Sequence, residues 1–85
     1  MTRRVIDRGR ITVYGTQWCA DCRRAKKLFN DHGISYSWVD VDQDSSGMKY
    51  IKKINGGKCI VPTIVFGDGS ILVEPSNSEL LQKLE

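Results

Sequence analysis

The sequence predicts one α/β domain with the element order βαβαββα, in which three helices flank a mixed four-stranded sheet. Short runs rich in β-branched and aromatic residues alternate with segments whose apolar residues recur every three or four positions. The first two strands are joined through a helix, which favours a right-handed parallel crossover. The last two are separated only by "GDGS", which favours an antiparallel hairpin. A chain of 85 residues fits a single domain of this kind.

The polar N-terminus leads directly into the first strand. Residues 1–9 carry charged residues and a glycine, and we expect a flexible tail there, followed by the folded domain over residues 10–85. The run "RITVYG", residues 10–15, is predicted to be the first strand, and it ends at a glycine.

The first helix is predicted from Cys19 to the residues before Gly33. Its apolar positions follow helical spacing: Cys22, Ala25, Leu28 and Phe29. Gly33 is the expected stop, because glycine readily adopts the left-handed conformation that ends helices. The run "SYSWVDVD", residues 35–42, is predicted to be the second strand.

The second half of the chain repeats the alternation. "DSSGMKYIKKING" predicts a helix with Ser45 or Ser46 as N-cap and an apolar face, the residues on that face being Met48, Ile51 and Ile54. "IVPTIVF" is a continuous apolar run, typical of a strand buried on both faces, and "ILVE" is the strand after the turn. "PSNSELLQKL" predicts the last helix, with Ser76 and Glu79 spaced as in a capping box.

Composition excludes several classes of protein. No apolar stretch approaches the ~20 residues of a membrane span, and the N-terminus lacks the apolar segment of a secretory signal, so we expect a cytoplasmic protein that binds no membrane. The net charge is only +3, and the basic residues are interspersed with acids without interleaved aromatics, so we expect no nucleic-acid partner. Three cysteines in a reducing compartment argue against a disulfide scaffold.

The pair Cys19 and Cys22 in "TQWCADC" is the candidate redox centre. A disulfide between them would close a very small loop and would stabilise the fold by only about 2 kcal/mol, so a structural role explains it poorly. Unpaired amides at a helix N-terminus favour an anion, so we expect Cys19 to be the nucleophilic thiolate. Cys22, one turn further in, is expected to be more buried and to resolve a mixed disulfide formed on Cys19.

Two other interpretations of the pair remain open at this point. A zinc site needs four ligands, and only Cys59 and His32 are available to complete one. His32 is better explained as a solvent-facing residue at the end of the helix, and we expect no metal. The two cysteines could also be packed as small hydrophobic residues, but a strand, a CxxC pair and a helix in succession favour redox chemistry.

The chain resembles the glutaredoxin family of the thioredoxin superfamily over residues 10–84, on the basis of "VYGTQWCADC", "IVPT" and "DGSILVEPSNSELL". Trp18, "NGG" and "DGS" with "PS" are most similar to mycoredoxin-like bacterial glutaredoxins. The resemblance implies a thioredoxin-like fold and a cis bond between Val61 and Pro62. It also implies that the backbone of Val61 pairs with the bound thiol beside the active-site sulfurs.

The resemblance also implies a binding site for a small thiol. Thr16 stands where many glutaredoxins have a lysine, and Trp18 is expected to shield the site and contact partners. By analogy, the amides of Ser76 and Asn77 would hold a carboxylate of the thiol, and Lys58 would hold another. Cys59, three positions before Pro62, is expected to be an incidental, partly buried thiol or a site of regulatory oxidation.

These features predict a thiol-disulfide oxidoreductase that reduces mixed disulfides between proteins and a low-molecular-weight thiol. No cofactor is expected to be bound, and glutathione or a mycothiol-type thiol would be the co-substrate. The expected partners are disulfide-containing proteins, small thiols and a reductase, and the expected state is a monomer. One alternative is an electron donor to ribonucleotide reductase that is reduced by thioredoxin reductase. Another is an iron–sulfur cluster carrier, which Cys22 disfavours because such family members usually have serine there.

Overall fold

The computed structural model describes residues 10–84 and has the element order that the sequence predicts. The strands are β1 (Thr12–Gly15), β2 (Ser37–Asp40), β3 (Thr63–Val65) and β4 (Ile71–Val73). The helices are α2 (Ala20–Asp31), α3 (Ser45–Ile54) and α4 (Asn77–Leu84). The flexible tail expected at residues 1–9 lies outside the described residues.

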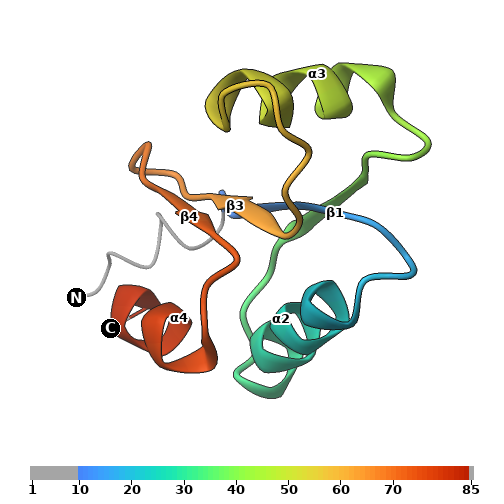
Figure 1. Ribbon diagram of the computed structural model, residues 1–85. Coiled ribbons are helices and arrows are strands. Elements are labelled where there is room, and N and C mark those ends of the chain that lie inside the picture. The colour runs from blue at the N-terminus through green and yellow to red at the C-terminus, as the bar shows by residue number, and fades with distance from the viewer. Residues whose placement is uncertain (1–9, 85) are drawn as a thin grey trace.

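The four strands form one mixed sheet in the order β2-β1-β3-β4. β1 pairs with β2 in parallel, whereas β3 is antiparallel to both of its neighbours. The predicted parallel crossover and the predicted hairpin are therefore confirmed. Helix α3 covers one face of the sheet, and α2 and α4 cover the other (Figure 1).

The main core lies between the sheet and the pair α2 and α4. Its buried members come from β1, α2, β3 and α4, with the residues just outside these elements: Ile11, Val13, Ala25, Leu28, Phe29, Ile64, Phe66, Leu80 and Leu84. Helix α2 turns all four predicted apolar positions inward, including Cys22. Gly33 follows the helix with a φ of 66°, as its predicted role as a stop requires.

The ends of several elements differ from the prediction. The cap of α3 is Asp44, whose carboxylate accepts the Gly47 N–H at 3.0 Å, so the prediction of Ser45 or Ser46 is wrong. A carboxylate in this position satisfies a first-turn amide and favours the positive end of the helix dipole, which leaves the serines inside the helix. The predicted cap of α4 is confirmed, because Ser76 and Glu79 exchange capping hydrogen bonds.

The third strand is shorter than its apolar run. Only Thr63–Val65 pairs with neighbouring strands, while Ile60, Val61 and Pro62 precede the ladder. Proline has no N–H to donate to a ladder, so pairing begins after it. Of these residues, Val61 approaches the start of α2, because its carbonyl oxygen lies 3.9 Å from Cys19 Sγ.

Over residues 10–84, no helix combines the length and the apolar character that crossing a membrane would need.

Candidate active site

Cys19 is the N-cap residue of α2. Its backbone is extended, with φ −89° and ψ 115°, and its Sγ accepts a hydrogen bond from the Cys22 N–H at 3.2 Å. Serine, threonine, aspartate or asparagine usually fill this position, and they do so with oxygen. Here a sulfur receives the first-turn amide, so a thiolate at Cys19 gains a hydrogen bond and a favourable interaction with the helix dipole.

Cys22 is completely buried, whereas Cys19 retains 9% of its surface, as the sequence predicts for a resolving cysteine and a nucleophile. Burial, followed by the hydrogen bond with Cys19, raises the pKa of the Cys22 thiol to about 12. The backbone N–H of Thr16 and the charge of Lys26 act in the opposite direction. Both cysteines are free thiols, so the structure describes the reduced pair.

Gly15, the last residue of β1, allows the strand to approach the buried sulfur. A Cβ at this position would lie 2.5 Å from Cys22 Sγ and 2.8 Å from Cη2 of Trp38. Real Cβ atoms do not tolerate contacts this short, so a side chain here would displace the sulfur or the ring. From the sequence, Gly15 was interpreted only as the end of a strand. Its position shortly before Cys22 was the one sequence signal for this close approach.

The segment before β3 closes the site from the opposite side. The Val61–Pro62 peptide bond is cis, Pro62 is buried, and the Cys19 thiol points to the carbonyl oxygen of Val61 at 3.9 Å. The Pro62 carbonyl accepts the Glu74 N–H at 2.8 Å, so the segment that leads into α4 lies beside Pro62. The structure therefore brings Cys19, Val61 and Pro62 together.

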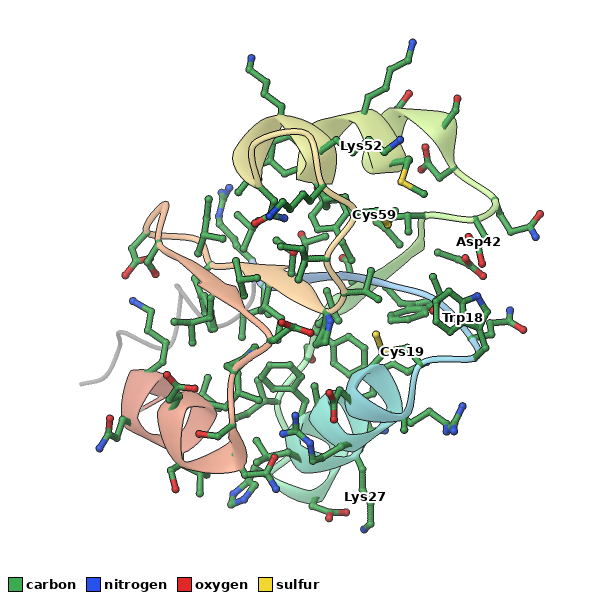
Figure 2. All side chains as sticks on the ribbon, in the orientation of Figure 1. Trp18, Cys19, Lys27, Asp42, Lys52 and Cys59 are labelled. Atoms are coloured by element: carbon green, nitrogen blue, oxygen red, sulfur yellow. The ribbon has the colours of Figure 1, made fainter. Side chains whose placement is uncertain are left out.

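Trp18 lies beside Cys19 with 70% of its surface exposed (Figure 2). Its indole N–H donates to Asp42 Oδ2 at 2.8 Å, so the exposed ring has one fixed edge. Thr16 is the opposite case, since it is 1% exposed and its hydroxyl has no hydrogen-bond partner within residues 10–84. Trp18 can meet an incoming molecule directly, whereas Thr16 faces the protein interior.

Ser76 and Asn77 at the start of α4 already have partners within the protein. The Ser76 N–H donates to Glu79 Oε1 at 2.8 Å, and the Asn77 side-chain oxygen accepts from Arg24 Nη1 at 2.8 Å. Arg24 also donates to the Pro75 carbonyl at 3.1 Å, and so connects α2 to the start of α4. The Ser76 amide, which the resemblance assigned to a ligand carboxylate, therefore holds the protein's own carboxylate. The hydrogen bonds of Arg24 to the start of α4 are contacts that the sequence did not predict.

Lys58 and Cys59 lie in the loop between α3 and β3, and both are exposed. The prediction that Cys59 is partly buried is wrong, because its side chain is exposed on this loop. His32 is exposed just after α2, as predicted. Among the described residues, no group of three His, Cys, Asp or Glu side chains could hold a metal ion.

Comparisons with known proteins agree with this geometry. The family model described as glutaredoxin matches residues 11–71. A protein of Mycobacterium tuberculosis that carries the name glutaredoxin is 38% identical over 74 residues, which are 87% of this chain and 88% of the relative. Mycoredoxin 1 of Corynebacterium glutamicum is 37% identical over 75 residues, which are 88% of this chain and 92% of the relative.

A solved structure shows the same fold. The glutaredoxin from Methanosarcina mazei Go1 superposes with a TM-score of 0.76 at 26% sequence identity, over 92% of this chain and 80% of that one.

Proposed function

The chain belongs to the glutaredoxin family of thiol-disulfide oxidoreductases, and we propose that it reduces mixed disulfides between proteins and a low-molecular-weight thiol. The observation that carries this proposal is Cys19 Sγ at the N-cap of α2, where the Cys22 N–H donates to it at 3.2 Å. A small domain with one such sulfur needs no further cofactor to exchange thiols for disulfides.

In the proposed reaction the Cys19 thiolate attacks the small-thiol sulfur of the mixed disulfide. A bond forms between that sulfur and Cys19, and the protein sulfur leaves with the electron pair and takes a proton from water. A second small thiol then attacks the adduct, which regenerates Cys19 and forms a small-molecule disulfide. Alternatively, Cys22 attacks Cys19 Sγ, which releases the small thiol and leaves a Cys19–Cys22 disulfide for a reductase.

We infer that the co-substrate is of the mycothiol type, which carries no free carboxylate, rather than glutathione, which carries two. Two observations support this choice. Relatives that match most of the chain include one named mycoredoxin. In addition, Glu79 occupies the Ser76 N–H, so this amide offers nothing to a ligand carboxylate. A thiol without that carboxylate avoids the repulsion from Glu79.

The proposal includes the other members of the reaction. Disulfide-containing proteins are the substrates, and a reductase returns the oxidised small thiol to its reduced form. We propose that the enzyme acts as a monomer in the cytosol, where the thiol pool keeps Cys19 and Cys22 reduced.

Two variants test the proposal. Cys22→Ser should keep much of the activity on a mixed disulfide of a peptide with the small thiol, because Cys19 and a second thiol suffice. It should lose reduction of an internal protein disulfide, and Cys19→Ser should lose both. Both reactions are measured by NADPH consumption in a coupled assay. Loss of both activities in a folded Cys22→Ser protein would favour the donor to ribonucleotide reductase instead. A coloured protein after aerobic purification would favour the cluster carrier.

A further inference from the structure

Lys26 lies one helical turn after Cys22 on α2, and residues four apart are neighbours on a helix surface. Its ammonium nitrogen is 3.7 Å from the centroid of the Trp38 ring, which belongs to β2. Both residues are half-buried. A cation over an aromatic ring is attracted to the ring face, so this charge has a defined position instead of moving freely in solvent.

Trp38 also reaches the buried sulfur. Its Cη2 and Cys22 Sγ both lie within 2.8 Å of the point where a Gly15 Cβ would stand, which makes the ring edge and the sulfur neighbours. The Trp38 ring therefore has its edge near Cys22 Sγ and its face beneath the Lys26 ammonium. Lys26 is positioned by β2 and not only by its own helix.

The groups around Cys22 come from four parts of the fold. Helix α2 contributes Cys19 and Lys26, the loop before it contributes the Thr16 N–H, β1 contributes Gly15, and β2 contributes the uncharged Trp38. Of these, only Cys19 and Lys26 ionise. When Cys19 is tied up in a mixed disulfide it is no longer ionisable, and Lys26 is then the charged neighbour that remains.

We infer that Lys26, held on Trp38, is a positioning residue for the release step, because its charge stabilises the thiolate that Cys22 must become. This inference rests on the proposed redox function of the pair. Cys22 first gives its proton to water, and its thiolate then attacks Cys19 Sγ of the adduct. The Cys22–Cys19 bond forms as the bond from Cys19 to the small thiol breaks, and the small thiol leaves with the electron pair and is protonated.

The expected slowing of the release step without the Lys26 charge follows from two opposing effects. If loss of the Lys26 charge lowers the fraction of Cys22 thiolate at neutral pH about tenfold, the adduct meets about tenfold less of the attacking group. The remaining thiolate is more nucleophilic by about threefold, because nucleophilicity rises with basicity. The net expectation is a release step slowed about threefold at pH 7, with its rise toward alkaline pH moved upward.

The test uses bis(2-hydroxyethyl) disulfide, an uncharged probe whose approach does not depend on lysine charges. All proteins carry Cys59→Ser, so that the exposed third thiol does not react. The reduced protein is mixed with the probe and quenched in acid, and intact mass follows formation and decay of the Cys19–mercaptoethanol adduct from pH 6 to 9. Lys26→Met keeps an apolar chain against Trp38, and Lys26→Arg keeps the charge.

Lys27→Met is the matched control. It removes the same charge from the adjacent residue, but Lys27 points to solvent and pairs with Asp31 at 2.8 Å (Figure 2). We expect adduct decay slowed about threefold in Lys26→Met with a shifted pH profile, and near-native decay in Lys26→Arg and Lys27→Met. Native decay in Lys26→Met, or equal slowing in both Lys26 variants without a pH shift, would overturn the inference. Failure of the unsubstituted pair to form either the adduct or the Cys19–Cys22 disulfide would instead refute the proposed function.

Discussion

Helices α2 and α4 begin in the same region of the molecule, but different atoms cap their N-termini. At α4, oxygen atoms do the capping, since the Ser76 hydroxyl accepts the Glu79 N–H at 3.1 Å and the Glu79 carboxylate accepts the Ser76 N–H. At α2, the Cys19 sulfur accepts the Cys22 N–H at 3.2 Å. The side chain of Arg24 connects the two helix starts, because it extends from α2 and donates to Asn77 of α4.

The difference separates stability from reactivity. The oxygen caps of α4 satisfy backbone donors with strong acceptors and leave no reactive group at that helix end. The sulfur cap of α2 is a weaker acceptor, but it keeps a nucleophile at the positive end of a helix dipole. Activity should therefore depend on α2, while α4 should influence stability and the choice of thiol.

The largest expected effect comes from replacing the sulfur cap with an oxygen cap. Cys19→Ser should lose all measurable thiol-disulfide exchange, because a neutral hydroxyl does not replace the thiolate as nucleophile. The same change should raise the free energy of unfolding by about 0.5 kcal/mol, because serine is a preferred N-cap residue. Urea unfolding and the peptide mixed-disulfide assay measure the two effects. A variant that is inactive but clearly less stable would contradict the idea that this cap gives up stability for reactivity.

Gly15→Ala tests how tightly β1 packs behind the α2 cap. The new methyl group would lie 2.5 Å from Cys22 Sγ and 2.8 Å from the Trp38 ring, so we expect a loss of unfolding free energy. Overpacking of this kind costs about 1–3 kcal/mol. Chemical denaturation of Gly15→Ala, Cys22→Ala and the double variant gives the coupling free energy between the new methyl group and the Cys22 sulfur. The double variant should lose less than the two single losses added together, and strict additivity would mean that the methyl group meets something other than the sulfur.

The pH dependence of stability tests the buried half of the pair. The Cys22 thiol has an ordinary pKa of 9.0, which burial raises to about 12 in the folded protein. The contribution of the Cys22 thiol to the free energy of unfolding is therefore complete below pH 9. It is lost as the pH rises toward 12, because this thiol loses its proton in the unfolded chain before it does so in the folded protein. At pH 10 the reduced protein should have lost about 1.4 kcal/mol relative to Cys22→Ala. Tyr14, whose pKa burial also raises, is common to both proteins and cancels. Parallel stability curves over this range would contradict the burial argument.

Local sequence patterns predicted most features of the two helix starts. The helical spacing of Cys22, Ala25 and Leu28 identified the buried face of α2, and the spacing of Ser76 and Glu79 identified the capping box. These signals are local, since each depends on residues within a turn or two of one another. The succession of strand, CxxC pair and helix favoured redox chemistry over metal binding and packing. Resemblance to a family supplied the small-thiol substrate and the cis bond at Pro62.

Contacts between distant segments were not predictable in the same way. Arg24 bonds to a residue that lies 53 positions away, and Trp18 bonds to one that lies 24 positions away. Lys26 stacks on Trp38 only because β2 pairs with β1 in a particular register. The error at Asp44 had another cause, because three consecutive residues there can cap a helix and only the backbone decides among them.

The smallest expected effect concerns the choice of thiol at the α4 cap. Glu79→Gln keeps an oxygen that can accept the Ser76 N–H and removes one negative charge from the first turn of α4. This helix start lies close to Pro62, because Glu74 bonds to the Pro62 carbonyl at 2.8 Å. A carboxylate of glutathione approaching the start of α4 would therefore meet less repulsion. Since exposed charge pairs contribute up to about 1 kcal/mol, kcat/KM with glutathione should rise about two- to fivefold. With uncharged mercaptoethanol it should not change, and the gain should shrink in high salt. An equal gain with both thiols would show that the substitution altered the active site in general, and no gain with glutathione would remove Glu79 from thiol selection.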